Sequence, residues 1–274
     1  MNNTKPKTRK QKQVKDLQIL PICFFGHRRR KLAVLCIQRL KEHLKMTGYT
    51  PKFIFGNCGK DEEYRSMVIQ AIKDNFGESA IHKVFDCPGV EGLKNGLNAS
   101  MNACLKEAFT LSPVVLRTED DFIQEHDLDI GPWCDLLQED EGVCGVRLGQ
   151  IGIEPECVKP YRPDLNLDWL DYKPGARYPV NNQIFLVTKR IYNMTGWYRE
   201  DFTIDEAEFD LGRIYRVRCG NFQKGPYPKV LWPHGQPVTL DESPNRIFVH
   251  AGASTLGHQH FTDNIPERYL KYQE

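Results

Sequence analysis

The sequence predicts an α/β fold, with a Rossmann-like, mostly parallel sheet flanked by helices. Short apolar segments alternate with amphipathic segments over residues 17–122, which is the pattern of strands joined by helical crossovers. One of the apolar segments ends in three consecutive acids, Glu119, Asp120 and Asp121. With 274 residues, of which 40% are hydrophobic, the chain is also long enough to bury a large core.

Apolar spacing predicts the first strand, the first helix and the second strand. Residues 17–25 form a nearly continuous apolar run, which is typical of a strand buried on both faces. A helix is expected over 31–45, because apolar residues recur there at every third or fourth position. These residues are Leu32, Leu35, Cys36, Leu40 and Leu44. The short apolar run at 52–55 predicts the second strand.

A second helix, a third strand and a third helix lead to the acids. The helix over 62–76 is predicted by one apolar face, made of Val68, Ala71, Ile72 and Phe76. The run at 81–85 predicts a strand. The next helix is indicated by a stripe of Leu97, Met101, Cys104, Leu105 and Ala108. The strand that follows this helix ends at the three acids.

Residues 123–274 lack this regular alternation and are expected to be richer in loops. Proline, glycine and aromatic residues are frequent there, and 220–245 is expected to be a long loop. An apolar run at 182–188 predicts one more buried strand, and the charged segment 202–218 predicts a helix. Residues 1–16 form a basic tail that is expected to be disordered, ahead of one domain over 17–274.

Composition excludes several classes of protein. The net charge is +1, and no apolar run approaches the roughly 20 residues of a membrane-spanning helix. The nine cysteines contain no C-x-x-C pair, so neither a disulfide framework nor a zinc ribbon is predicted. The N-terminal residues lack the apolar centre of a signal peptide. The expectation is a cytoplasmic protein in a reducing environment.

The acid cluster is the strongest chemical signal. Three adjacent carboxylates at the end of a buried strand repel one another unless a cation lies between them. A hard divalent ion with oxygen ligands, such as Mn²⁺ or Mg²⁺, often takes this place and is often shared with nucleotide phosphates. Ligands of parallel sheets bind beyond the carboxyl ends of the strands, which is where these acids are expected.

Two further motifs fall on the same predicted edge. Gly26 and Arg28 follow the first strand in the segment Phe-Phe-Gly-His-Arg. Asn95 and Asn98 lie in a glycine- and asparagine-containing stretch that opens the helix before the acidic strand. Together with the Glu-Asp-Asp triplet, and in this order, they resemble the motifs of glycosyltransferases of the GT-A fold. The resemblance extends over residues 19–260.

The resemblance implies a site for a nucleotide-diphosphate sugar. Asp121 would bind the metal ion, and Asp120 would reach the ribose hydroxyls or the water shell of the metal. Glu119 would be the outer member of the triplet, and Arg28 would contact the base or the diphosphate. The remaining nucleotide-binding residues implied are Gly26, Asn95 and Asn98.

Two later segments extend the resemblance. The acidic stretch 204–213 resembles the segment in which the family places a catalytic carboxylate, and both Glu208 and Asp210 are candidates for the base that deprotonates the acceptor. Arg213 at the end of the stretch is placed to orient one of them. His250 resembles a late histidine that contacts the metal or the diphosphate.

The sequence therefore predicts a metal-dependent glycosyltransferase, with a nucleotide-binding half at 17–122 and an acceptor-binding half at 123–274. A UDP-sugar is the favoured donor and inversion the favoured stereochemistry. The acceptor is a hydroxyl group of a glycan, a protein or a hydroxylated nucleic-acid base, the last kept open by the basic tail. The alternatives are a metal-dependent phosphohydrolase or nuclease, built from the same acids and histidines, and a non-catalytic nucleotide-sugar-binding module.

Overall fold

The structure is a computed structural model that describes residues 17–26, 29–59, 61–87, 96–149, 158–170, 184–220, 228–235 and 247–251. Its helices are α1 (Arg30–His43), α2 (Glu62–Phe76), α3 (Gly96–Leu111), α4 (Gly131–Glu139), α5 (Lys189–Thr195) and α6 (Ile204–Gly220). Two short 3₁₀ helices lie at Glu78–Ala80 and Pro163–Leu165. The predicted tail at 1–16, with Arg28 and Asn95, falls outside the described residues.

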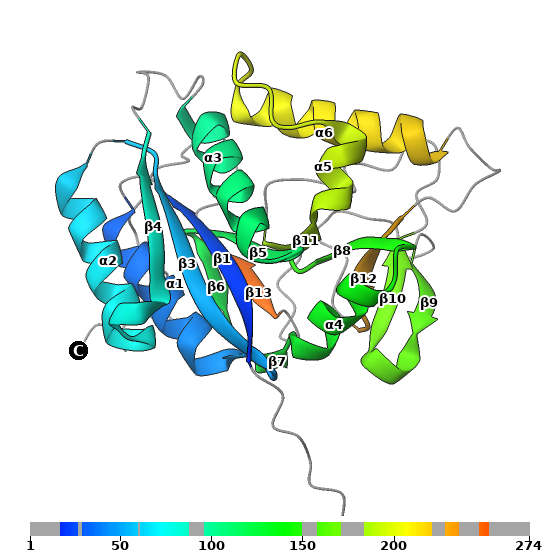
Figure 1. The fold of residues 1–274 in the computed structure, drawn as a ribbon, viewed down its shortest axis with the longest axis horizontal. Coiled ribbons are helices and arrows are strands. Elements are labelled where there is room, and N and C mark those ends of the chain that lie inside the picture. Colours follow the sequence, from blue (N-terminus) through cyan, green and yellow to red (C-terminus); the bar gives the residue numbers. More distant parts are fainter. Residues whose placement is uncertain are drawn as a thin grey trace, which may run out of the picture.

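The strands of the described residues form one large sheet and two small ones (Figure 1). In the large sheet the order is β4-β3-β1-β5-β11-β8-β12-β10-β9. Its strands are β1 (Gln18–Gly26), β3 (Tyr49–Asn57), β4 (Ile81–Asp86), β5 (Val114–Glu119), β8 (Val143–Arg147), β9 (Val158–Arg162), β10 (Leu167–Leu170), β11 (Phe185–Thr188) and β12 (Lys229–Pro233). The small sheets pair β6 (Phe122–Gln124) with β13 (Phe248–His250), and β2 (Leu44–Lys45) with β7 (Leu128–Asp129).

The first four strands of the large sheet confirm the predicted parallel half. β1 pairs in parallel with β3 and with β5, and β3 pairs in parallel with β4. The chain moves outward from β1 to β3 and β4, and then returns to place β5 on the other side of β1. The strand order therefore reverses between β1 and β5, which is the position where open α/β sheets bind their ligands.

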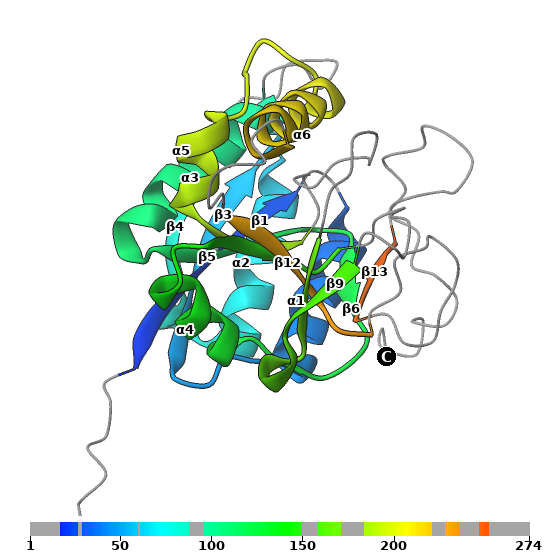
Figure 2. The same ribbon diagram turned by 90° about the vertical axis from the view of Figure 1, so that its right-hand side faces the viewer.

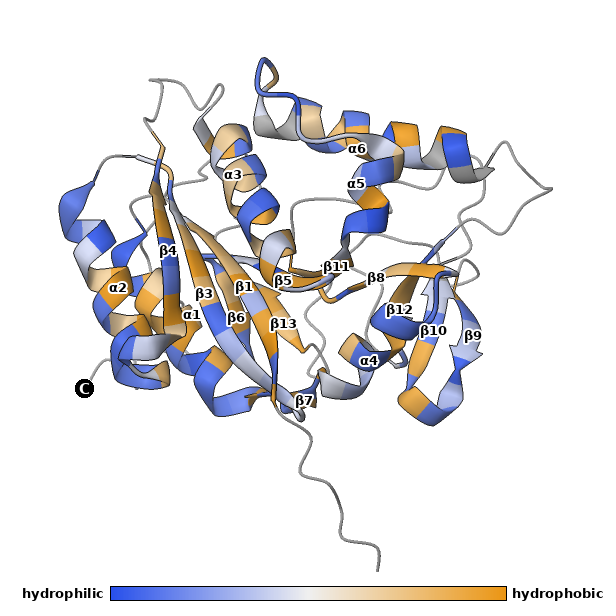
Figure 3. Cartoon of the chain, viewed as in Figure 1, coloured by the Kyte–Doolittle hydropathy of each residue, from blue (hydrophilic) through white to orange (hydrophobic). Residues whose placement is uncertain are grey.

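Helices cover both faces of the sheet. Successive strand residues point to opposite faces, so β1 contributes side chains to a hydrophobic cluster on each face. On one face, Leu20, Ile22 and Phe24 pack in the same hydrophobic cluster as residues of α1, α2 and α4. On the other, Cys23 and Phe25 pack with residues of α3, α5 and α6, three helices that gather at the top in Figures 1 and 2. β1 is accordingly hydrophobic over most of its length, whereas the edge strand β9 is hydrophilic (Figure 3).

The second half of the chain contains more sheet than the sequence predicts. The predicted strand at 182–188 is β11, and the predicted helix at 202–218 is α6. However, β8, β9, β10 and β12 were not expected, and β11 and β10 run antiparallel to their neighbours. Proline within β9 and at the end of β12 weakens the strand pattern of these segments. No described helix is both long and apolar enough to span a bilayer.

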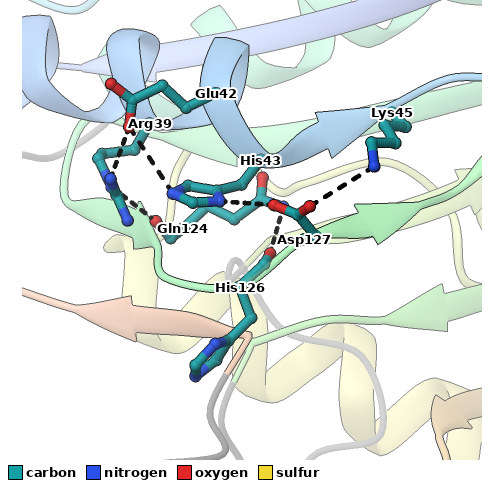
Figure 4. Close-up of polar contacts among 7 residues, drawn as sticks. All are labelled: Arg39, Glu42, His43, Lys45, Gln124, His126 and Asp127. Carbon is teal, nitrogen blue, oxygen red and sulfur yellow. Dashed lines mark hydrogen bonds and ion pairs between the residues drawn. The ribbon is translucent and has the colours of Figure 1, made fainter.

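A polar clamp joins α1 to the segment that follows the acids (Figure 4). Arg39 is buried, and its Nε donates to the backbone carbonyl of Gln124 in β6 at 3.1 Å. The same guanidinium pairs with Glu42 one turn further along α1. Nearby, His43 lies 2.8 Å from Asp127, and the exposed Lys45 lies 3.5 Å from the same carboxylate. The inner part of this clamp holds the end of β6, three residues after Asp121.

We expect Arg39→Met to lower the free energy of unfolding by about 1.5–3 kcal/mol, because it removes a charge-assisted hydrogen bond to a buried carbonyl while keeping the apolar stem. The matched control is Lys45→Met, which removes an exposed ion pair of the same cluster and should cost at most about 1 kcal/mol. Urea unfolding at an unchanged m value measures both. Equal losses in the two variants would contradict the assignment of Arg39 as the inner clamp.

Candidate functional site

The three acids lie at the carboxyl end of β5, next to the end of β1. The register pairs Phe25 with Glu119, so Gly26 comes beside Asp120. Asp120 and Asp121 are each 1% exposed, and they form the turn between β5 and β6. The carbonyl oxygen of Asp121 accepts a hydrogen bond from the amide of Ala251 at 2.8 Å. The predicted cluster is thus buried, at the predicted edge, and held in place through its backbone.

A guanidinium bridges the two aspartates. Arg29 Nη1 lies 2.8 Å from Asp120 Oδ1 and 2.7 Å from Asp121 Oδ2, and the Arg29 side chain is 13% exposed. Burial opposes the charge of Arg29, but the two carboxylates outweigh burial and raise the pKa of Arg29. The cation that the carboxylates require is therefore supplied, in this structure, by the residue preceding α1.

Asp120 is held from two further directions. The Tyr64 hydroxyl donates to Asp120 Oδ2 at 2.9 Å, and the Cys36 thiol lies 3.4 Å from the Asp120 carbonyl oxygen. Gly26 approaches both groups so closely that a Cβ built on it would lie 1.8 Å from the Tyr64 hydroxyl and 2.5 Å from Asp120 Oδ2. The glycine predicted at the end of the first strand is therefore needed for close approach to the acid cluster.

Glu119 is the least satisfied of the three acids. Its Oε1 is buried and has no hydrogen-bond partner among the described residues. Burial raises the pKa of Glu119 well above its usual range, and the charge of Asp121 adds to the effect, whereas Arg117 opposes it. Additional positive charge at this edge would stabilise the ionised form of Glu119.

The cluster has the chemistry of a partial site for a hard divalent ion. Its metal-binding atoms are carboxylate oxygens, which suit Mn²⁺ and Mg²⁺. Among the described residues, the buried Oε1 of Glu119 accepts no hydrogen bond. The described side chains do not bring three metal-binding groups together around one point. The set therefore fits an ion that keeps phosphate or water in the rest of its shell, as Mg²⁺ commonly does.

The two candidate bases on α6 have different surroundings. Glu208 lies close enough to the acid cluster for its charge to raise the pKa of Glu119, and it also interacts electrostatically with the buried Arg117. Asp210 instead pairs with Arg213 of the same helix, at 2.9 Å between Oδ1 and Nη2. The charge of Glu208 thus acts on the acid cluster, whereas Asp210 pairs with a half-exposed arginine on α6.

Asn98 lies on α3 and contacts the segment that precedes α6. Its amide nitrogen donates to the carbonyls of Arg199 and Phe202, both at 2.9 Å. One turn further along, Asn102 exchanges hydrogen bonds with the backbone of Tyr198. These two asparagines tie α3 to the start of α6. Asn98 thus has a structural role in the described residues. The nucleotide contact that the sequence predicts for Asn98 would be a second role.

His250 ends β13, where it pairs with Phe122, the residue after Asp121. The backbone pairing thus brings position 250 next to the acid cluster. Arg29 and Tyr64, by contrast, are not among the residues that the sequence predicts at the site. The sequence signal for Arg29 is the run of three arginines at 28–30 that follows the first strand. Tyr64 carried no signal, because it occupies an ordinary apolar position of α2.

No family model and no curated protein sequence matches the chain. Among solved structures it is similar to S. aureus TarS, at 11% identity and a TM-score of 0.48, covering 79% of this chain and 60% of the other. For the mannosyltransferase PcManGT from Pyrobaculum calidifontis, solved with GDP-Man and Mn²⁺, the identity is 11%, the TM-score 0.48, and the coverage 86% and 57%. For GalNAc-T7, solved with UDP, GalNAc and Mn²⁺, the identity is 12% and the TM-score 0.49, and the match covers 78% of this chain and 42% of the other. The chain thus spans from about two fifths to three fifths of these structures, and with TM-scores below 0.5 they do not assign it to a family.

Proposed function

We propose that the protein is a glycosyltransferase that transfers a sugar from a nucleotide-diphosphate donor to a hydroxyl acceptor, with a divalent ion at the acid cluster. The supporting observation is the place of Glu119, Asp120 and Asp121 at the carboxyl edge between β1 and β5, where the strand order reverses. This is the ligand-binding position of open α/β sheets. A UDP-sugar is the favoured donor.

The site residues have two proposed roles toward the donor, metal binding and nucleotide binding. Asp121 and Asp120 would hold Mn²⁺ or Mg²⁺, with Glu119 beside them and His250 as the further ligand implied by its position. When bound, the ion acts as a Lewis acid that stabilises the negative charge of the departing diphosphate. Gly26 and Asn98, together with Arg28 and Asn95, would contact the nucleotide.

Glu208 is the proposed general base for an inverting transfer. Its carboxylate takes the proton of the acceptor hydroxyl as that oxygen forms a bond to the anomeric carbon of the sugar. The bond between the anomeric carbon and the diphosphate oxygen breaks in the same step, and the nucleoside diphosphate leaves with the electron pair. The observation that supports Glu208 is that its charge acts on both Glu119 and the buried Arg117.

Transfer is favoured over phosphate hydrolysis by the distribution of acids. Enzymes that hydrolyse phosphate esters with two ions gather several carboxylates and histidines from separate segments. The described residues hold no group of three or more such side chains that surrounds an ion. A single cluster that faces one ion, together with one carboxylate on a separate helix, suits the transfer of a sugar.

The function is tested by incubating the full chain with UDP- and GDP-sugars and Mn²⁺, without an acceptor. Slow release of UDP or GDP and free sugar is expected, because water replaces the acceptor hydroxyl. Chromatography of the nucleotides identifies which bond breaks. Release of a nucleoside monophosphate would show phosphate hydrolysis instead, and unchanged donors in the presence of candidate glycan, protein and nucleic-acid acceptors would contradict a transferase.

We expect Asp121→Asn to abolish Mn²⁺-dependent binding of UDP in calorimetry, because a neutral amide is a poor ligand for a hard ion. The fold should persist, since Arg29 keeps Asp120 as a partner, and circular dichroism checks this. Asp127→Asn is the matched control, because it removes a carboxylate from an exposed pair outside the site. If Asp121→Asn bound UDP and Mn²⁺ as the wild type does, Asp121 would not be the metal ligand.

We expect Glu208→Gln to lower turnover by about 100- to 10,000-fold, the usual effect of removing a general base. Donor affinity should change little, because the base acts on the acceptor. Asp210→Asn is the matched control on the same helix and should retain turnover within a factor of about three, since general-base effects are far larger. Turnover and UDP affinity are measured for both variants. A loss confined to Asp210→Asn would place the base at Asp210, and normal turnover of both would exclude this helix.

A further inference from the structure

Arg29 occupies the position between the two aspartates that a bridging cation would take. One nitrogen, Nη1, contacts a carboxylate oxygen of Asp120 and of Asp121, at 2.8 and 2.7 Å. Both carboxylates are almost completely buried, and the guanidinium is 13% exposed. A divalent ion that binds the same two oxygens and the Arg29 guanidinium therefore compete for one place.

The electrostatic cost of this competition depends on what else is bound. If an ion alone enters, Arg29 must leave its carboxylates, and a largely buried charge loses its partners, which is costly. Like charges a few ångströms apart also repel in a partly desolvated site. A diphosphate changes this, because it brings negative charge to the same edge, and a guanidinium binds phosphate oxygens through its fork of N–H donors.

We propose that Arg29 exchanges counter-ions, leaving Asp120 and Asp121 for the donor diphosphate when a divalent ion takes the two carboxylates. The ion and the nucleoside diphosphate consequently bind together, and each of them binds only weakly without the other. The inference rests on the proposed function and deepens it, since it assigns a diphosphate contact to Arg29 and explains why ion and donor are coupled. By linkage, each ligand tightens the other by the same factor.

Arg29 has the position that such an exchange requires. It is the N-cap residue of α1, and its partly exposed guanidinium changes partner by rotation about side-chain bonds, which leaves the backbone of α1 in place. The next residue provides the contrast. Arg30 pairs with Asp61 at 3.0 Å and with Glu63 at 2.9 Å, both at the start of α2 and neither a member of the acid cluster. Arg30 is therefore the matched control for Arg29.

The test measures Mn²⁺ binding by calorimetry, with and without UDP, in the wild type, Arg29→Gln and Arg30→Gln. In the wild type, UDP should tighten Mn²⁺ binding by about 10-fold or more, within the range of ordinary coupling between sites. In Arg29→Gln, Mn²⁺ alone should bind about 10-fold more tightly than in the wild type, UDP should bind more weakly, and the coupling should largely disappear. Arg30→Gln should behave as the wild type does.

Thermal unfolding with Mn²⁺ alone gives a second readout. Arg29→Gln leaves two buried carboxylates without their guanidinium, so its melting temperature should fall and Mn²⁺ alone should restore it. Arg29→Lys retains a competing charge, so its response to Mn²⁺ should stay close to that of the wild type.

Three results would overturn the inference. One is that Arg29→Gln binds Mn²⁺ no more tightly than the wild type. Another is that the wild type binds Mn²⁺ as tightly alone as with UDP, a result that does not depend on any variant. In both cases the proposed function stands if UDP still binds. If the wild type binds neither UDP nor GDP at any Mn²⁺ concentration, the proposed function fails, and the exchange fails with it.

Discussion

Three carboxylates at the end of one buried strand need positive charge, and this requirement organises the centre of the molecule. Arg29 meets it for Asp120 and Asp121 with a single bridging nitrogen. The helix that follows, α1, then runs beside the chain after the acids, and Arg39 holds the carbonyl of Gln124 ten residues further along α1. The acidic turn and the end of β6 are thereby held by two residues of one helical segment, its N-cap residue Arg29 and Arg39.

The same requirement constrains the neighbouring strand. β1 has to end in a residue without a side chain, because Tyr64 and Asp120 already fill the space beside Gly26. Tyr64 comes from α2, so three separate segments meet at one carboxylate. Close packing of this kind transmits small changes, and any ligand that repositions Asp120 also acts on β1 and α2.

The other side of the proposed site depends on a different set of contacts. Asn98 and Asn102 fasten α3 to the segment before α6 through backbone carbonyls. The buried Arg117 of β5 donates a hydrogen bond to the Tyr198 hydroxyl of that segment and interacts with Glu208. α6 is thus oriented by β5 itself, two residues before the acids begin. The proposed metal ligands and the proposed base are consequently positioned by one strand.

The sequence by itself determined the parallel half of the fold and the place of the acid cluster. Both follow from local patterns, because apolar runs, helical spacing and three adjacent acids can be recognised in the sequence without knowing what packs against them. The tertiary structure decided the partners. Arg29 contacts both aspartates, Tyr64 donates a hydrogen bond to Asp120, and the charge of Glu208 acts on Glu119. These contacts join residues far apart in the chain, 91 positions in the case of Arg29 and Asp120, and no periodicity records them. The added strands β9, β10 and β12 have the same explanation, because these short segments, two of which contain proline, become strands only through pairing with a sheet that is already formed.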